Sequence, residues 1–158
     1  MPVRLYIAGL AVAAVLLAVA TGLLAASVRN TSVAGAQRAA VLLAARQEAL
    51  NLTNLDQQAG GRDFDAVLAG SAGSLRQQLA GGRSAFMRAL TANGVASAGS
   101  VLDAGVVSAG SSSATVLLNV KATVRNKQAS VPQVRLYHWQ AGLVFSGGRW
   151  LVTSLEFV

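Results

Sequence analysis

Cysteine is absent from this sequence of 158 residues, and proline, histidine and acidic residues are scarce, with two, one and six copies respectively. Without cysteine the chain has no disulfide bond, no thiol nucleophile and no thiolate ligand for a metal ion. Lysine is nearly absent as well, because only Lys121 and Lys127 occur and arginine supplies the other basic residues. Any catalytic site would therefore have to be built from very few ionisable side chains.

The basic residues are in excess, and the net charge is +7. A positive surface can attract nucleic acid or anionic lipid headgroups. The arginines are nevertheless spread singly through the chain, and no basic cluster is interleaved with the aromatic residues that stack on bases. We therefore expect a dispersed positive surface and no nucleic-acid partner.

One long stretch lacks charge altogether, namely residues 5–28 between Arg4 and Arg29. As a helix that rises about 1.5 Å per residue, it can cross a hydrocarbon core about 30 Å thick. A cleavable signal peptide is the alternative, with Ala18-Val19-Ala20 as its cleavage site, but the apolar run continues well past that point. The sequence therefore predicts a cytoplasmic head over residues 1–4 and a transmembrane anchor over residues 5–28.

A stripe of small residues follows one face of the predicted anchor, with one member at every fourth position: Ala14, Ala18, Gly22 and Ala26. Small side chains let two membrane helices approach closely, which favours their association within a bilayer. An alanine-rich span also produces such a stripe by chance. A membrane-embedded contact at these four residues is accordingly a hypothesis.

After the anchor, residues 29–59 are predicted to form a juxtamembrane segment and the first helix of the domain. Between Ser32 and Ala59 apolar residues recur at helical spacing, and Glu48 and Asn51 lie off this stripe. Gly60-Gly61 is expected to end the helix.

The remainder of the domain, residues 60–158, begins with helical segments. Gly70 to Gly73 is expected to interrupt them, and Gly81-Gly82 either kinks one helix or divides two. Asn93-Gly94 is expected to close the helical half. Helices therefore precede all predicted strands.

From residue 95 onward the pattern is that of β-structure. Apolar and polar residues alternate from Ala114 to Arg125, which predicts a strand with one buried and one solvated face. Turn residues divide the region into four strands, near residues 97–108, 114–126, 133–145 and 149–157. Simple alternation in the last strand places Leu155 and Phe157 on one face and Trp150 and Val152 on the other.

Helices followed by a meander indicate an α+β fold with helices on one face of a curved antiparallel four-stranded sheet. Gly142 is a candidate for a bulge that helps the sheet to bend.

Several segments resemble the Mce-associated membrane proteins, which are actinobacterial accessory proteins of mammalian cell entry (Mce) transporters. The similarity covers the placement of the anchor and nearly the whole domain. Its most specific part is the terminal string from Gly147 to Val158. The other segments that carry it are Ala45-Arg46-Gln47, Asn51-Leu52-Thr53-Asn54-Leu55-Asp56 and Ala114-Thr115-Val116-Leu117.

This resemblance implies a cone-shaped domain with a nuclear transport factor 2-like fold outside the cytoplasmic membrane. It further implies association with, and stabilisation of, an Mce-type lipid or sterol import complex. The charges that flank the anchor leave its orientation open, so the extracytoplasmic location of the domain follows from the resemblance. Alternatives are a lipid or sterol ligand in the cone cavity, or a scaffold in a secretion or conjugation apparatus.

The only candidate for acid-base chemistry is a cluster of His138, Asp103 and Glu156 in the cavity of such a fold. The alternative places a lone histidine on the sheet surface. The sequence contains no nucleophile elbow and no phosphate-binding loop. We therefore expect no enzyme activity, no catalytic residues, no cofactor and no metal.

The aromatic residues Tyr137, Trp139 and Trp150 offer a different kind of site. If they lie on the outer side of the sheet, they form a patch of the type enriched in protein contacts. If they line the interior of the cone, they belong to its core. The alternation of residues leaves both placements open.

Overall fold

The computed structural model describes residues 34–158, and Arg38–Val158 form one compact unit. The predicted head and anchor, with Ala14, Ala18, Gly22 and Ala26, lie outside the described residues. Among residues 34–158 no helix combines the length and the apolar character that crossing a membrane requires.

Three helical segments precede most of the sheet. The first covers residues 34–53 and is called helix 34–53 below; it is followed by α2 (Gly60–Gly70) and α3 (Gly73–Asn93). Phe64 and Phe86 bring α2 and α3 together, with ring centroids 5.3 Å apart. An ion pair of 2.6 Å between Arg83 and Asp65 joins the same two helices.

The first helix ends earlier than the sequence predicted. After Thr53 the chain leaves the helix, and the Asn54 side chain accepts a hydrogen bond of 2.8 Å from the Gly99 backbone N–H. Leu55–Asp56 then form the short strand β1. Gly60 begins α2 instead of ending the first helix, and it packs where a Cβ would lie 3.0 Å from Leu90. These long-range contacts override the local helical pattern.

The third helix passes through Gly81-Gly82 without a break. A Cβ at either glycine would meet nothing within 4 Å, so no packing contact forces a kink there. The predicted end at Asn93-Gly94 is confirmed. Gly94 has φ of 60°, and its N–H donates to the Leu90 and Thr91 carbonyls, which is a left-handed helix cap.

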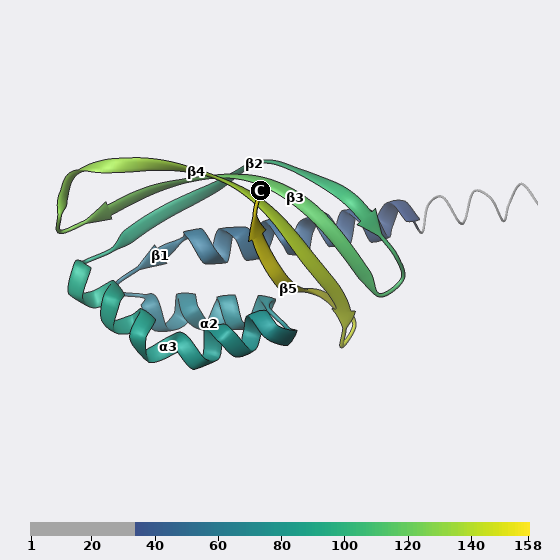
Figure 1. The fold of residues 1–158 in the computed structure, drawn as a ribbon, viewed down its shortest axis with the longest axis horizontal. Helices are drawn as coiled ribbons and strands as arrows, with labels where there is room; N and C mark the ends of the chain where they lie inside the picture. The colour runs from purple at the N-terminus through teal and green to yellow at the C-terminus, as the bar shows by residue number, and fades with distance from the viewer. Residues whose placement is uncertain (1–33) are drawn as a thin grey trace, which may run out of the picture. The chain divides into compact units, whose positions relative to one another are not determined.

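The sheet has five antiparallel strands in the order β1-β2-β3-β4-β5. The prediction of four strands was wrong, because it missed the short edge strand β1, which pairs with β2. The four long strands are β2 (Ala96–Ala109), β3 (Ser113–Asn126), β4 (Ala129–Ser146) and β5 (Arg149–Phe157). A strand of two residues carries no alternation from which it could be predicted. Figure 1 shows the sheet curving around helix 34–53, with α2 and α3 on the same side.

The core lies between the concave face of the sheet and helix 34–53. The helix contributes mainly small side chains, and the sheet contributes larger ones. The alternation predicted for β3 is confirmed, because its inward residues are buried: Ala114, Val116, Leu118, Val120 and Ala122. The helix residues buried against them are Val41, Ala45 and Ala49.

The face assignment for the last strand was wrong because β5 contains a bulge. Gly142 pairs with Ser154 but Leu143 pairs with Val152, so Thr153 is the extra residue. Its hydroxyl donates a hydrogen bond of 3.1 Å to the Gly142 carbonyl. The bulge shifts the alternation by one position, so the buried residues Trp150 and Val152 share the inner face of the sheet with Leu155 and Phe157. The bulge expected at Gly142 is thus present, with the extra residue on the neighbouring strand.

Two glycine substitutions should change stability in opposite directions. Gly81→Ala should stabilise the chain by about 0.5 to 1 kcal/mol, because alanine lowers the backbone entropy of the unfolded chain and Gly81 lies exposed in a helix interior. Gly94→Ala should destabilise it by about 1 to 2 kcal/mol, because alanine is strained at positive φ. Urea unfolding of the full-length variants measures both effects. A loss of stability in Gly81→Ala would show that the glycine pair has a structural role.

Candidate functional site

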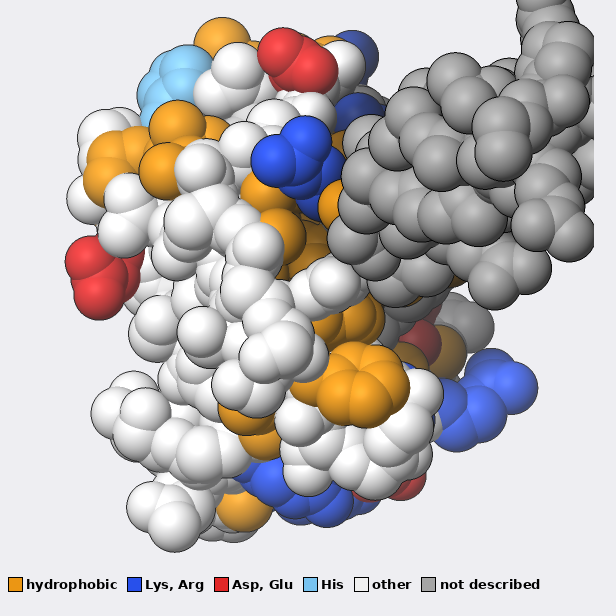
Figure 2. All heavy atoms as spheres, turned by 90° about the vertical axis from the view of Figure 1, so that its right-hand side faces the viewer, with side chains coloured by type: hydrophobic (Ala, Val, Ile, Leu, Met, Phe, Trp, Pro, Cys, Tyr) orange, Lys and Arg blue, Asp and Glu red, His pale blue; other side chains and the backbone are white. Residues whose placement is uncertain are grey.

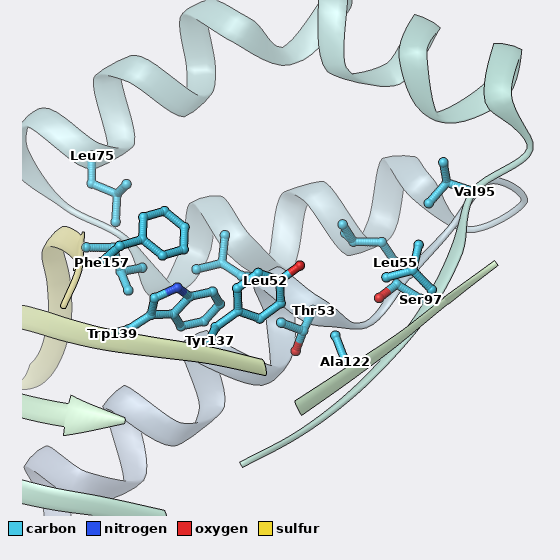
Figure 3. A pocket seen from close by; sticks show the side chains of 12 residues that line it. Leu52, Thr53, Leu55, Leu75, Val95, Ser97, Ala122, Tyr137, Trp139 and Phe157 are labelled. Atoms are coloured by element: carbon cyan, nitrogen blue, oxygen red, sulfur yellow. The ribbon is translucent and has the colours of Figure 1, made fainter. Parts of the chain in front are cut away.

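A cavity of about 400 Å³ lies beneath the concave face of the sheet (Figure 3). Helix 34–53, α3 and all five strands contribute to its wall. The lining residues are Leu52, Thr53, Leu55, Leu75, Val95, Ser97, Ala122, Val124, Tyr137, Trp139, Leu155 and Phe157. The cavity therefore depends on the tertiary fold and not on one segment.

The cavity begins where helix 34–53 ends. Leu52 and Thr53 are the last helical residues, and the chain then turns into β1 at the edge of the sheet. The Thr53 side chain packs against Gly99 so closely that a Cβ there would lie 1.9 Å from the threonine hydroxyl oxygen. Small side chains, including Ser97 and Ala122, face the remaining space, so it stays unfilled.

Three aromatic rings form one side of the cavity. The rings of Tyr137 and Trp139 are stacked with centroids 5.4 Å apart, and the Phe157 ring meets Trp139 edge-on at 6.3 Å. Phe157 is 76% exposed, whereas Trp139 is only 8% exposed. The aromatic side thus runs from the buried core to the surface at Phe157.

The polar groups of the cavity are uncharged. None of its twelve lining residues is an aspartate, glutamate, lysine, arginine or histidine. Thr53 donates its hydroxyl to the Ala49 carbonyl at 2.7 Å. The Tyr137 hydroxyl makes no hydrogen bond with another residue between 34 and 158, and in Figure 3 it points into the space that the labelled side chains enclose.

The aromatic residues singled out in the sequence lie on the inner side of the sheet. Trp139 and Tyr137 line the cavity, whereas Trp150 is buried elsewhere in the core, 5.5 Å from Phe145 between ring centroids. Of the two placements that the sequence left open, the structure has the interior one. Whether any of the three contacts a protein partner stays a prediction.

His138 lies on the outer face of the sheet, away from the cavity. It is exposed, and its Nδ1 lies 2.7 Å from the Asn119 side-chain oxygen. Asp103, which pairs with Asn119 across the strands, borders the same surface depression, but Glu156 does not. No group of three potential metal ligands occurs in residues 34–158. The three residues considered for acid-base chemistry are therefore not assembled in the cavity.

A buried carboxyl group was missed by the sequence analysis. Glu48 lies off the apolar stripe of its helix, yet it is only 1% exposed. Its Oε2 accepts a hydrogen bond of 3.1 Å from Asn51, which also donates to the Ala66 carbonyl of α2. Its Oε1 has no hydrogen-bond partner among the described residues. Burial raises the pKa of the Glu48 carboxyl from 4.5 to about 7, and the Asn51 hydrogen bond opposes this rise.

The carboxyl of Glu48 fits because Gly70 has no side chain. A Cβ at Gly70 would lie 1.8 Å from Glu48 Oε2. Helix α2 therefore covers a face of helix 34–53 that the sequence of helix 34–53 marks as polar. The only sequence signal was the glycine at the end of α2, which could equally have served as a helix terminator.

Solved structures of similar fold identify the architecture. An IcmL-like type IV secretion system protein from Legionella pneumophila has a TM-score of 0.61 at 14% identity, covering 77% of this chain and 91% of that chain. The periplasmic domain of DotI has a TM-score of 0.61 at 13% identity, with coverage of 76% and 94%. A ketosteroid isomerase-like protein from Erwinia carotovora atroseptica has a TM-score of 0.50 at 20% identity, with coverage of 75% and 92%. The expected nuclear transport factor 2-like fold is confirmed.

Sequence comparison then gives the family. Residues 5–158 match the family described as uncharacterized protein Rv1363c/MT1408-like, and the chain belongs to that family. None of the curated proteins matches the chain.

The raised pKa of Glu48 predicts a pH-dependent stability. The folded state holds the proton of the Glu48 carboxyl more tightly than the unfolded chain does. The contribution of this proton to the free energy of unfolding is therefore complete below pH 4.5. It is lost as the pH rises towards 7, by about 3 kcal/mol in all. Glu48→Gln should remove this part of the pH dependence in urea unfolding between pH 4 and 8. Glu156→Gln, at an exposed acid, is the control, and an unchanged profile in Glu48→Gln would contradict the prediction.

The contact between Glu48 and Gly70 can be tested by a double-mutant cycle. Gly70→Ala should destabilise the chain by about 1 to 3 kcal/mol, because the new methyl group collides with the buried carboxyl. In a Glu48→Ala background the same substitution should cost much less. Thermal unfolding of the four variants measures the coupling, and equal costs in both backgrounds would rule out the collision.

Proposed function

We propose that the chain is a non-enzymatic, membrane-anchored accessory subunit that associates with and stabilises an Mce-type lipid or sterol import complex. Its transporter partners would be protein subunits, and the bilayer would hold the anchor. The observation that carries this proposal is the outer face of the sheet, which no helix within Arg38–Val158 covers. The helical elements of the compact unit lie on the other side of the sheet (Figure 1).

Apolar side chains are exposed on this outer face. Val134 and Leu136 are 63% and 62% exposed on β4, and Leu117 is 42% exposed on β3. The outer face of a one-sided antiparallel sheet is ordinarily polar, so the neighbouring apolar pair Val134 and Leu136 favours a protein contact. Leu117 is a separate apolar position on this face, because Asn119 and His138 lie between it and Leu136. Lys121 is paired with Leu136 and would supply part of a polar rim.

The charge distribution favours a protein partner over a nucleic acid that would be held by charge alone. Figure 2 shows lysine and arginine side chains at several separate places on one face of the molecule, with uncharged and apolar groups between them. Such a surface lacks the continuous basic stripe expected for a nucleic-acid partner.

The structural neighbours support an extracytoplasmic location for the domain. The DotI structure is that of a periplasmic domain with a similar fold. The expected anchor of this chain would place its domain in an equivalent position. The IcmL-like neighbour belongs to a type IV secretion system, so a scaffold in a secretion apparatus is the second candidate. The resemblance of the terminal string to Mce-associated proteins favours the importer.

Within residues 34–158 the candidate acid-base residues His138, Asp103 and Glu156 are not gathered in the cavity, which supports a non-enzymatic role. The cavity wall offers hydroxyl groups but no carboxylate and no imidazole. His138 faces the opposite side of the sheet, where its Nδ1 lies 2.7 Å from the Asn119 side-chain oxygen.

The proposal predicts that a charge on the outer face will weaken the complex. Leu136→Asp should reduce recovery of transporter subunits at least several-fold in an in-cell crosslinking and pull-down experiment, because it places a charge in an apolar contact. Leu43→Asp is the matched control, since Leu43 is 70% exposed on helix 34–53. Mass spectrometry of the recovered proteins separates an Mce complex from secretion components.

Equal recovery for both variants and the unmodified chain would refute docking through this face. His138→Ala is expected to leave complex recovery and transport unchanged. Loss of transport in that variant, with recovery intact, would instead support an enzymatic role.

A further inference from the structure

We propose that the cavity beneath the sheet binds one neutral lipid, a molecule with an apolar body and a single hydrogen-bonding oxygen. This inference concerns the inner face of the sheet and does not depend on docking through the outer face. Four observations carry it: the size of the cavity, its uncharged lining, the free Tyr137 hydroxyl and the exposed Phe157 ring.

The size and lining suit an apolar ligand. A volume of about 400 Å³ lies within the range of roughly 300 to 1,000 Å³ that is common for small-molecule sites. Aliphatic side chains and three aromatic rings provide most of the wall. A ligand that fills this space would bury hydrocarbon on both sides of the contact, which is the main source of affinity in such sites.

The absence of charge in the lining restricts the head of the ligand. Burying a carboxylate or phosphate without a cationic partner is costly, and neither lysine nor arginine lines the cavity. A fatty acid anion or a phospholipid headgroup would therefore be disfavoured inside. A neutral hydroxyl or carbonyl group requires only one hydrogen-bond partner.

Tyr137 can supply that partner. Its hydroxyl points into the enclosed space and is unpaired within residues 34–158, whereas the neighbouring Thr53 hydroxyl is already bonded to Ala49. Stacking on Trp139 holds the phenol ring in place. The phenol would donate to, or accept from, the oxygen of the ligand.

Phe157 marks the entrance. Its ring remains largely exposed although it contacts both Trp139 and Tyr137. An apolar ring that is exposed beside an apolar cavity gives an entering hydrocarbon a continuous surface to follow. The first contact would be with Phe157, and the ligand would then reach the buried residues Trp139 and Ala122.

Photocrosslinking can test the site and its preference for neutral lipids. The full-length chain in phosphatidylcholine nanodiscs is treated at pH 8 with a photoreactive long-chain alcohol, the carboxylate of equal chain length, or a photoreactive sterol. Mass spectrometry maps the labelled residues. We expect labels on the cavity wall, with the alcohol or the sterol labelling at least about tenfold more efficiently than the carboxylate. The comparison of alcohol and sterol identifies which neutral lipid fits.

Two variants test the assigned contacts. Tyr137→Phe keeps the stacked ring but removes the hydroxyl, and it should reduce labelling by the neutral probe about threefold to tenfold. Leu55→Trp should fill the cavity and abolish labelling, with circular dichroism confirming that the variant is folded. Leu136→Asp on the outer face should label like the unmodified chain, which separates this inference from the proposed docking.

Equal labelling by the carboxylate, labels confined to residues outside the cavity, or no competition by an excess of the unlabelled form of the neutral lipid that labels would overturn the site. Unchanged labelling in Tyr137→Phe would overturn the assigned hydrogen bond.

Discussion

The packing of helix 34–53 against the concave face of the sheet is the contact on which the rest of the domain depends. Small residues such as Ala45 and Ala49 let the helix approach the buried side chains of β3. Because the helix ends at Thr53, the space beyond it is bordered by β1, α3 and the curved sheet but is not filled, and it stays partly open to solvent. The close packing of the core thus stops where the helix stops, and the cavity lies beyond that point.

The opposite side of helix 34–53 shows how a polar residue can be buried at moderate cost. Glu48 is covered by α2 only because Gly70 offers no side chain, and Asn51 links the carboxyl to the Ala66 carbonyl. With a pKa near 7, the carboxyl is largely neutral under mildly acidic conditions, which avoids the larger penalty of a buried charge. The helix is therefore enclosed on two sides, although its sequence pattern shows one apolar stripe.

Local sequence patterns correctly predicted the elements whose residues are buried at regular intervals. They failed where contacts between residues distant in sequence determine the ends and faces of an element. The alternation in β3 and the glycine cap at Gly94 were predictable, because each rests on a few neighbouring residues. The end of helix 34–53 was not, since Asn54 is held by Gly99 across 45 positions of sequence. The bulge at Thr153 depends on pairing with β4, and one extra residue reversed the faces of Trp150 and Val152. The cavity combines seven elements and has no local signature.

Strand β4 connects the two faces to which separate roles are assigned. Leu136 and His138 point outward, whereas Tyr137 and Trp139 point into the cavity and the core. A ligand that contacts Tyr137 and a protein that contacts Leu136 would act on the same short stretch of backbone. If either shifts this strand, thermodynamic linkage requires that each alters the affinity of the other by the same factor. The alternation of one strand thus places a residue of the proposed lipid site next to a residue of the proposed docking surface, on opposite faces of the sheet.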